Sequence, residues 1–176
     1  MDINFTDPRD GHIYRTVKIG GQTWMAENLN YKTENSWCYD NDESNGKKYG
    51  RLYTWETAQT VCPSGWHLPS REEWGNLVEA AGGYKVAGKK LKSKTGWDDR
   101  DDGTSGNGTD EFGFSALPGG YRVYSDGSFY YVGYYGYWWS ATEYGSGDAD
   151  NRDMGYNYDY VGENYDGKSN GFSVRC

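Results

Sequence analysis

The amino-acid sequence predicts an α+β domain in which a β-hairpin and two helices precede a run of antiparallel strands. Three features indicate this: apolar–polar alternation around a Gly-Gly pair, two stretches with helical spacing, and short aromatic segments separated by turn residues. With 176 residues, the chain is most simply a single domain, residues 1–176, large enough to bury a core. Aliphatic residues are few and tryptophans number eight, so that core has to consist largely of aromatic rings.

The first third predicts a hairpin followed by a surface loop. Residues 13–19 alternate apolar and polar side chains, and the pair Gly20-Gly21 separates them from residues 22–25. A tight turn between two such segments is typical of a β-hairpin. Residues 35–50 are polar and rich in turn formers, which predicts a loop at the surface.

Two helices are expected in the middle of the chain. Residues 54–61 have helical spacing and end before Pro63. Ser70 and Glu73 form a capping box, which starts a helix that runs through an apolar stripe and ends at Gly82-Gly83. Residues 86–94 are compatible with a further helix or with a strand.

The remainder predicts an acidic loop and then strands. Residues 98–110 are rich in Asp and Gly, and Asp126-Gly127 marks a turn between the first two strand candidates. The strand candidates are residues 121–125, 129–132, 137–142, 154–160 and 171–175. If the last strand returns beside the first hairpin, the termini lie close together and the long loops lie on the far side.

Charge and hydropathy exclude two classes of partner. A net charge of −8 leaves no basic stripe for phosphate contacts, so nucleic acid is not an expected partner. No apolar run is long enough to insert into a membrane, and residues 1–10 lack the features of a signal peptide. We therefore expect a soluble chain, either a domain of a longer exported protein or one exported without a signal peptide.

The last third has the composition of a contact surface. Residues 121–176 contain 12 of the 18 tyrosines together with many Gly, Asp, Asn and Ser residues. Tyrosine gives rigid, amphipathic contact area, and Ser, Gly and Asn adapt their hydrogen bonds, as in antibody paratopes. Rigid apolar landmarks and abundant aromatic rings argue against disorder. The predicted ligand-binding residues are Tyr144, Asp150, Asn151, Asp153, Asn157, Tyr158, Asp159, Tyr160, Asn164 and Tyr165, because they form no apolar stripe; Arg152, Met154, Val161 and Phe172 are expected to be scaffold.

An aromatic platform for sugars is the alternative binding surface. Side chains alternate along a strand, so at most one of Trp138 and Trp139 points outward, and we expect both to belong mainly to the scaffold. For the tyrosines just before them, core and contact roles are about equally expected. These are Tyr130, Tyr131, Tyr134, Tyr135 and Tyr137.

Catalytic and metal sites are weaker hypotheses. His67 and Cys62 suggest a nucleophile–base pair, but a structural role for both is the better interpretation. The acidic residues 98–103 could hold calcium, yet Thr109 stands where an EF-hand needs Glu, and solvated charge is the favoured interpretation. We expect no cofactor and no other metal, because the three cysteines lack zinc spacing. One structural disulfide and one spare thiol is the simplest use of those cysteines.

Seven segments carry a resemblance to a known family: DGHIY (10–14), GQTWMAENLN (21–30), YGRLYTW (49–55), CPSGWHLPS (62–70), DEFGFSALPGGYR (110–122), YWWSAT (137–142) and GFSVRC (171–176). In this order they resemble the Fibrobacter succinogenes major paralogous domain, a family of bacterial surface-associated modules. The resemblance implies a C-type-lectin-like fold. It also implies kinship with proteins that diversity-generating retroelements vary near the C-terminus, with residues 1–142 as scaffold, 143–170 as the candidate variable segment and 171–176 as the terminal strand.

The cysteines depart from the family pattern, in which a further cysteine stands near the position of Gly46 and would pair with Cys38. Its absence leaves Cys38 as the free thiol and Cys62 with Cys176 as the disulfide that the resemblance implies. Closing so long a loop contributes about 3–5 kcal/mol in an oxidising compartment. Two buried reduced thiols are the alternative if the protein matures in a cytoplasm.

These expectations converge on a non-catalytic recognition module outside the cell or on its surface, or on a virion. It would bind an extracellular protein or glycan, as a surface adhesin or as a phage receptor-binding protein. A glycan-binding module is the alternative, and an enzyme related to the formylglycine-generating enzyme is the least favoured. The sequence does not predict the oligomeric state.

Overall fold

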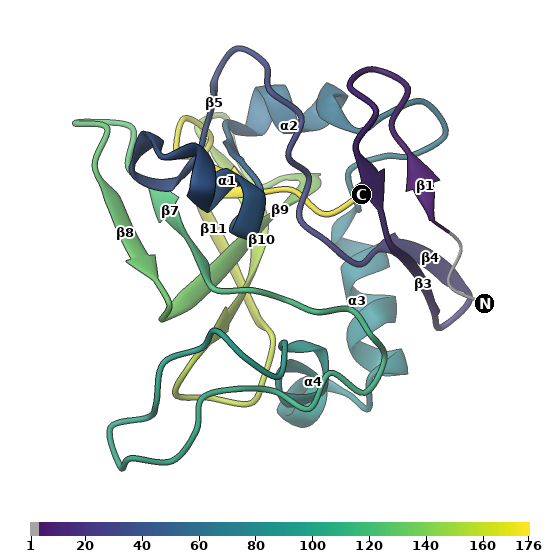
Figure 1. Cartoon of the computed structure of the whole chain (residues 1–176), viewed down its shortest axis with the longest axis vertical. Helices are drawn as coiled ribbons and strands as arrows, with labels where there is room; N and C mark the ends of the chain where they lie inside the picture. The colour runs from purple at the N-terminus through teal and green to yellow at the C-terminus, as the bar shows by residue number, and fades with distance from the viewer. Residues whose placement is uncertain (1–3) are drawn as a thin grey trace.

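Most strands of the molecule belong to one mixed sheet (Figure 1). The structure is a computed structural model and describes residues 4–176. Its helices are the 3-10 helix η1 (Tyr39–Asn41) and α1 (Glu43–Tyr49), α2 (Trp55–Val61), α3 (Arg71–Ala80) and α4 (Tyr84–Leu91). Its strands are β1 (Phe5–Thr6), β2 (Ile13–Tyr14), β3 (Thr16–Ile19), β4 (Gln22–Met25), β5 (Ser36–Trp37), β6 (Leu52–Tyr53), β7 (Gly119–Arg122), β8 (Phe129–Val132), β9 (Tyr135–Glu143), β10 (Asp148–Gly155), β11 (Gly162–Gly167) and β12 (Phe172–Ser173).

The main sheet has the strand order β11-β10-β9-β12-β6-β5, and β7 lies beside β9 and pairs with β8. Strands β12 and β7 run parallel to β9, whereas the other neighbours are antiparallel. Strands β3 and β4 form a separate hairpin, and β1 pairs with β2. The predicted α+β class is therefore confirmed.

Local sequence signals place the hairpin and two helices as predicted. Gly20 and Gly21 both have positive φ, which suits the tight turn between β3 and β4. The Thr54 side chain accepts a hydrogen bond from the Thr57 backbone and starts α2. At α3, the side chains of Ser70 and Glu73 cap each other's backbone N–H groups. Residues 86–94, left open between helix and strand, fall largely in α4.

The predicted surface loop over residues 35–50 is wrong. This segment contains β5, η1 and α1. The Asp42 side chain caps α1 by accepting from the Ser44 backbone, and Lys47 and Lys48 lie in its last turn, where positive charge is favourable. Gly46 lies in the middle of α1, and because glycine has low helix propensity the sequence pattern did not indicate a helix here.

The strand predicted over residues 154–160 is also wrong. Strand β10 ends at Gly155, a turn follows, and β11, which was not predicted, begins at Gly162. Both strands consist mainly of polar residues, so neither shows the apolar alternation by which a strand is usually recognised.

The sheet separates two aromatic cores. Trp138 packs with Trp24, Trp74 and Phe114 on one side, whereas Trp139 packs with Phe172 on the other. Both central tryptophans are 0% exposed, because successive side chains of β9 point to opposite faces and each face is covered. The prediction that they are scaffold is confirmed. Aromatic residues are 11 of the 31 buried hydrophobic residues among residues 4–176, so the expectation of a largely aromatic core holds only in part.

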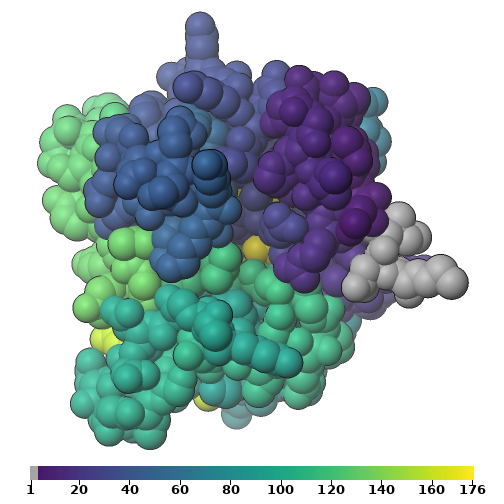
Figure 2. Space-filling model, viewed as in Figure 1, coloured from purple at the N-terminus to yellow at the C-terminus, as the bar shows by residue number. Residues whose placement is uncertain are grey.

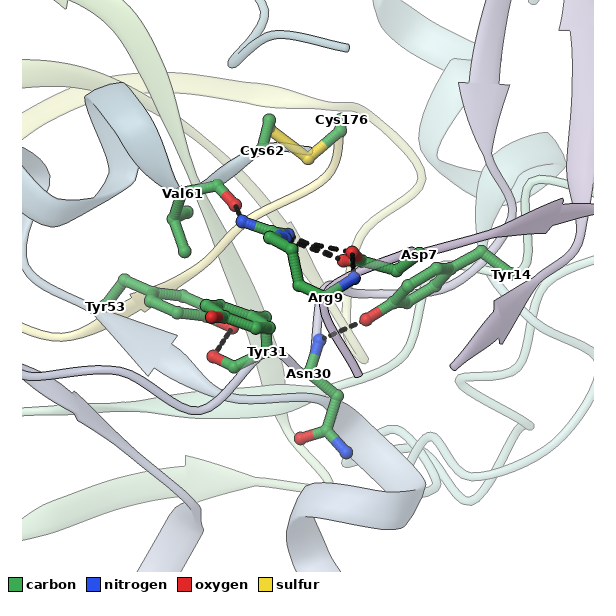
Figure 3. The surroundings of a disulfide bond; sticks show 9 residues. All are labelled: Asp7, Arg9, Tyr14, Asn30, Tyr31, Tyr53, Val61, Cys62 and Cys176. Carbon is green, nitrogen blue, oxygen red and sulfur yellow. Dashed lines mark hydrogen bonds and ion pairs between the residues drawn. A yellow bond between two sulfur atoms is a disulfide. The ribbon is translucent and has the colours of Figure 1, made fainter. Parts of the chain in front are cut away.

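The C-terminal segment returns beside the first hairpin. The backbone N–H groups of Met25 and Leu29 donate to the carbonyls of Cys176 and Val174, each at 2.9 Å. Cys176 also forms the predicted disulfide with Cys62, whose Cα atom is 6.0 Å away (Figure 3). The disulfide therefore joins the end of α2 to the last residue of the chain.

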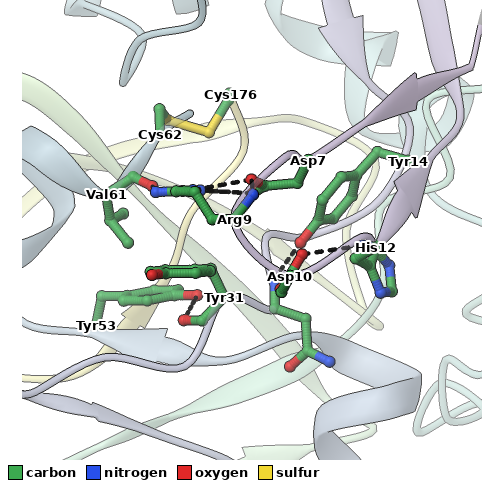
Figure 4. A network of polar contacts seen from close by, with 11 residues as sticks. Asp7, Arg9, Asp10, His12, Tyr14, Tyr31, Tyr53, Val61, Cys62 and Cys176 are labelled. Carbon is green, nitrogen blue, oxygen red and sulfur yellow. Dashed lines mark hydrogen bonds and ion pairs between the residues drawn. A yellow bond between two sulfur atoms is a disulfide. The ribbon is translucent and has the colours of Figure 1, made fainter. Parts of the chain in front are cut away.

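Next to this disulfide, an ion pair between a buried carboxylate and a more exposed arginine attaches the N-terminal segment. Asp7 is fully buried and accepts from the Arg9 guanidinium, which also donates to the carbonyl of Val61 at 2.8 Å (Figures 3 and 4). The hydrogen bonds from Arg9 hold the pKa of Asp7 below its usual value. On the other side of this segment, the backbone of His12 donates to Asp10 (Figure 4).

Arg175 connects the two cores through hydrogen bonds to an amide oxygen and to backbone carbonyls. Its guanidinium is 0% exposed and donates to the Asn28 side chain and to the carbonyls of Met25 and Phe114. The same Asn28 oxygen accepts from the indole of Trp138 at 2.8 Å. Burial lowers the pKa of Arg175 to about 9.

Candidate ligand-binding surface

Nine tyrosine rings form a continuous group over β7, β8, β9 and the turn between β10 and β11, which we call the tyrosine face. Its rings lie 4.1–6.2 Å apart between the centroids of neighbours, in tilted, perpendicular and stacked pairs. The members are Tyr121, Tyr130, Tyr131, Tyr134, Tyr135, Tyr137, Tyr156, Tyr158 and Tyr160.

The tyrosine face contains an open hollow of about 520 Å³, lined by Tyr131, Tyr134, Tyr135, Tyr137 and Tyr156. Tyr131 and Tyr134 are 49% and 44% exposed. Exposed tyrosine in such quantity provides contact area of the kind found at binding surfaces.

Glycines and one strained residue shape the hollow. Tyr131 has φ of 68° and Gly133 has φ of 88°, so the chain turns sharply between β8 and β9. A Cβ atom at Gly136 would overlap the ring of Trp138, and one at Gly155 would overlap the ring of Tyr158. Tyr158 can therefore lie over β10 only because residue 155 has no side chain.

Helix α4 holds the turn that carries Tyr158 and Tyr160. The Nζ of Lys92 donates to the carbonyls of Gly155 and Tyr158 at 2.8 and 3.0 Å, and the backbone of Lys89 donates to Asp159. Gly88 approaches the Tyr160 carbonyl so closely that any Cβ there would overlap it. Lys92 is 0% exposed, and burial lowers its pKa to about 8.

Below the rings, carboxylates and amides form a polar floor. Asp153, only 6% exposed, accepts from the Tyr158 hydroxyl and, at 2.5 Å, from the Asn164 amide. Asn151 donates to Asp166 at 3.0 Å, and burial raises the pKa of Asp166. Burial, reinforced by the Asp153 charge, also raises the pKa of Tyr158 far above its usual value.

The acidic loop, residues 98–110, borders the hollow and extends outward at the lower left of the molecule (Figures 1 and 2). The backbone of Asp98 donates to Gly133 at 2.9 Å, and Asp101 accepts from the Tyr156 hydroxyl at 3.1 Å. Arg100 is paired with Asp159 at 2.5 Å. Within residues 4–176, no group of three or more acidic, histidine or cysteine side chains has metal-site geometry.

The structure brings five of the ten predicted ligand-binding residues together at the tyrosine face and its margin. Tyr158 and Tyr160 stack at 4.1 Å, and Tyr160 stacks further on Tyr84 of α4. Asn157 and Asn164 are exposed beside them, and Asp159 lies at the margin, paired with Arg100.

Two predicted residues form a separate pair. Tyr144 and Tyr165 stack at 3.8 Å with their planes 4° apart, and they are 59% and 54% exposed. They lie at the far end of β9 from Tyr135, so the structure does not join them to the hollow.

The remaining three predicted residues are buried, which corrects their expected position at the surface. Asp150, Asn151 and Asp153 are at most 6% exposed. Asp150 faces Arg71 at 4.0 Å next to Arg152, and burial raises the pKa of Asp150. These side chains lie beneath the surface and not on it, because both faces of β10 are buried.

Several residues of the surface were missed or left undecided by the sequence prediction. Tyr121, Tyr156 and Asp166 were not among the predicted ligand-binding residues, and Tyr131, Tyr134, Tyr135 and Tyr137 were left between core and contact. Strand pairing brings these residues together, and part of the surface lies on the β10–β11 hairpin, which was not predicted. Abundant tyrosine was the one sequence signal that pointed to them.

The residues considered for catalysis have structural partners. Cys62 is disulfide-bonded, so its sulfur is not a thiolate. His67 pairs with Glu73 of the capping box at 2.7 Å, on the wall of a smaller hollow that Trp24 and Trp66 also line. Cys38 is a free, buried thiol, as the family comparison of the sequence implied, and burial raises its pKa.

Within residues 4–176, no helix is both long enough and apolar enough to span a bilayer.

Comparison with known proteins identifies the family. Neither the curated proteins nor the solved structures include a match to this chain. The family model for the Fibrobacter succinogenes major domain, in contrast, matches residues 17–176, and the chain therefore belongs to that family.

Proposed function

We propose that this chain is a non-catalytic recognition module that binds its ligand through the tyrosine face. The observation that carries the proposal is the hollow itself, in which five tyrosines surround an open space over the main sheet. Rigid aromatic rings lose little conformational entropy on binding, and the flanking Asn, Asp and Gly residues can adapt their hydrogen bonds.

The fold supports such a role because the buried cores hold the sheet in place while the tyrosine face stays exposed. Two aromatic cores hold β9, and the Cys62–Cys176 disulfide fixes the C-terminal segment. A disulfide is expected in an oxidising environment, which favours a cell-surface, secreted or virion location. The return of the C-terminal segment to the first hairpin supports a C-type-lectin-like fold as part of this proposal.

Diversification of the C-terminal segment is a further part of the proposal. The exposed positions in residues 143–170 are the ones open to variation, whereas the buried positions of β10 would have to be kept. A near-copy of the coding segment for residues 130–176 beside a reverse-transcriptase gene, with adenines at the Tyr and Asp codons, would support it. If the gene has no such neighbour, the module is a fixed adhesin.

Glycan binding is the second candidate function. Partly exposed rings such as Tyr131 and Tyr134 could stack on the apolar faces of sugars. An enzymatic role has less support, because the Cys62 sulfur is in a disulfide.

The test is to screen the full chain on arrays of extracellular proteins and of glycans. A variant with Tyr131, Tyr134 and Tyr156 each replaced by Ser should lose its ligand. The matched control carries Tyr124→Ser, which removes a ring that is 66% exposed but does not line the hollow. A ligand that the triple variant retains would refute the proposal, and a ligand of sugar type would select the second candidate.

A further inference from the structure

We propose that the hollow in the tyrosine face binds a positively charged side chain of a protein partner. This inference rests on the proposed recognition function and specifies the chemistry of its ligand. Three observations carry it: the angles between the rings, the charges around them, and the hydrogen bonds that the polar floor already makes within the chain.

The rings of the hollow are arranged as the walls of an open box. Tyr135 stands at 72° to Tyr131 and at 88° to Tyr156, with centroids 5.3 and 5.8 Å apart. Tyr134 stands at 88° to Tyr156. A cation binds to an aromatic ring when it lies over the ring face within about 6 Å of the centroid. Rings at right angles offer several such faces to one group.

Cations of the chain itself do not fill this box. Among residues 4–176, the rings that lie under a Lys or Arg side chain are Tyr31, Tyr49, Trp97, Trp37, Trp55 and Phe114. None of these lines the hollow. Arg100, the basic residue of the neighbouring loop, is engaged with Asp159.

Carboxylates make the surroundings negative. Asp101 accepts from the Tyr156 hydroxyl at 3.1 Å, which places an acidic group at the rim. Burial raises the pKa of Tyr135, and the charges of Asp153 and Asp101 add to this effect. With a net charge of −8, the whole chain attracts basic partners at long range.

The carboxylates of the polar floor already accept hydrogen bonds from side chains of the chain itself. Asp153 already accepts from Tyr158 and Asn164, and Asp166 accepts from Asn151. A sugar site needs such groups free to hydrogen-bond beside a ring, whereas a cation needs only the ring faces and the negative potential. The geometry therefore favours a cation over a glycan.

The first experiment compares choline with its neutral isostere, 3,3-dimethylbutan-1-ol, which has the same shape without the charge. Both are titrated into the 15N-labelled full chain, and amide shifts are followed at Gly133, Gly136 and Gly155. We expect choline to bind about fivefold or more tightly than the isostere, with shifts confined to the hollow. Equal affinity for the two compounds would overturn the proposal, because the hollow would then be a simple apolar pocket.

The second experiment uses matched variants. Tyr156→Leu keeps apolar volume but removes a ring, and it should weaken choline binding about fivefold, whereas Asp101→Asn should weaken it about twofold. Tyr144→Leu is the control, since Tyr144 is an exposed tyrosine at the other end of β9, and it should change nothing. Choline binding that Tyr156→Leu leaves intact would contradict the assigned position.

A lysine-rich peptide as competitor separates this inference from the recognition function. If the array ligand requires the tyrosine face but neither the peptide nor choline displaces it, the recognition function stands and the cationic chemistry is wrong. If choline binds in the hollow but the array ligand binds the tyrosine variants as well as it binds the wild type, the proposed recognition function is wrong and the cation site stands.

Discussion

A Cβ atom at Gly46 would lie 3.5 Å from the Cβ atom of Cys38 and would overlap the Cys38 sulfur. The separation of the two Cβ atoms is that of a disulfide. Gly46 in α1 therefore stands where a second cysteine could pair with the free thiol of Cys38.

The substitution Gly46→Cys should form this disulfide under oxidising conditions. Closing the short loop between residues 38 and 46 should raise the free energy of unfolding by about 2–3 kcal/mol. Urea unfolding of the oxidised variant and of the wild type measures the difference, and mass spectrometry after thiol labelling shows whether Cys38 is still free.

Gly46→Ala provides the matched control. It introduces the same Cβ atom without the bond, so the overlap with the Cys38 sulfur should destabilise the fold by about 1–3 kcal/mol despite the better helix propensity of alanine. An alanine variant as stable as the wild type would show that α1 moves freely away from Cys38.

The disulfide between Cys62 and Cys176 closes a much longer loop, with a sequence separation of 114. Replacing both cysteines with serine should lower the free energy of unfolding by about 3–5 kcal/mol. Guanidinium unfolding of the double variant beside the oxidised wild type measures this change. A loss below about 1 kcal/mol would mean that the hydrogen bonds of Met25 and Leu29 already hold the C-terminal segment in the unlinked chain.

The sequence predicts this fold best where a local signal is sufficient. The capping box of Ser70 and Glu73 and the glycine pair of the first hairpin both act within a few residues, and both predictions are confirmed. Helix α1 was missed because its stability depends on packing around Gly46 rather than on helix propensity.

The candidate surface shows the opposite case. Asp150 and Arg152 point to one face of β10, whereas Asn151 and Asp153 point to the other. Both faces are buried, so the polar composition of β10 led to the wrong prediction that its residues lie at the surface. Whether a tyrosine lines the hollow or lies in the core depends on which strands pair. Strand β9 pairs with strands from other parts of the chain, and no local sequence signal indicates those pairings. Composition could therefore locate the surface within the last third but could not select its residues.

The buried Lys92 should make stability depend on pH in an unusual direction. Its folded-state pKa of about 8 is below the ordinary value of 10.5, so the unfolded chain binds more protons between these values. Stability therefore rises with pH in this window. Relative to Lys92→Met, the wild type should gain about 2 kcal/mol between pH 7 and 9.5. Urea unfolding of both proteins at several pH values is the measurement, and parallel pH profiles would contradict it.

The hydrogen bonds to Asp153 should couple Tyr158 to Asn164. Tyr158→Phe removes one donor to a buried carboxylate and should cost about 1–2 kcal/mol of stability, as should Asn164→Ala. Because both donors serve the same acceptor, the double variant should lose more than the sum of the two, since Asp153 is then left buried with neither of them. Thermal and urea unfolding of the four proteins give the coupling, with Tyr144→Phe as the control for an exposed tyrosine. Strict additivity would show that solvent reaches Asp153 and replaces the missing donors, and the polar floor would then be open to ligand as well.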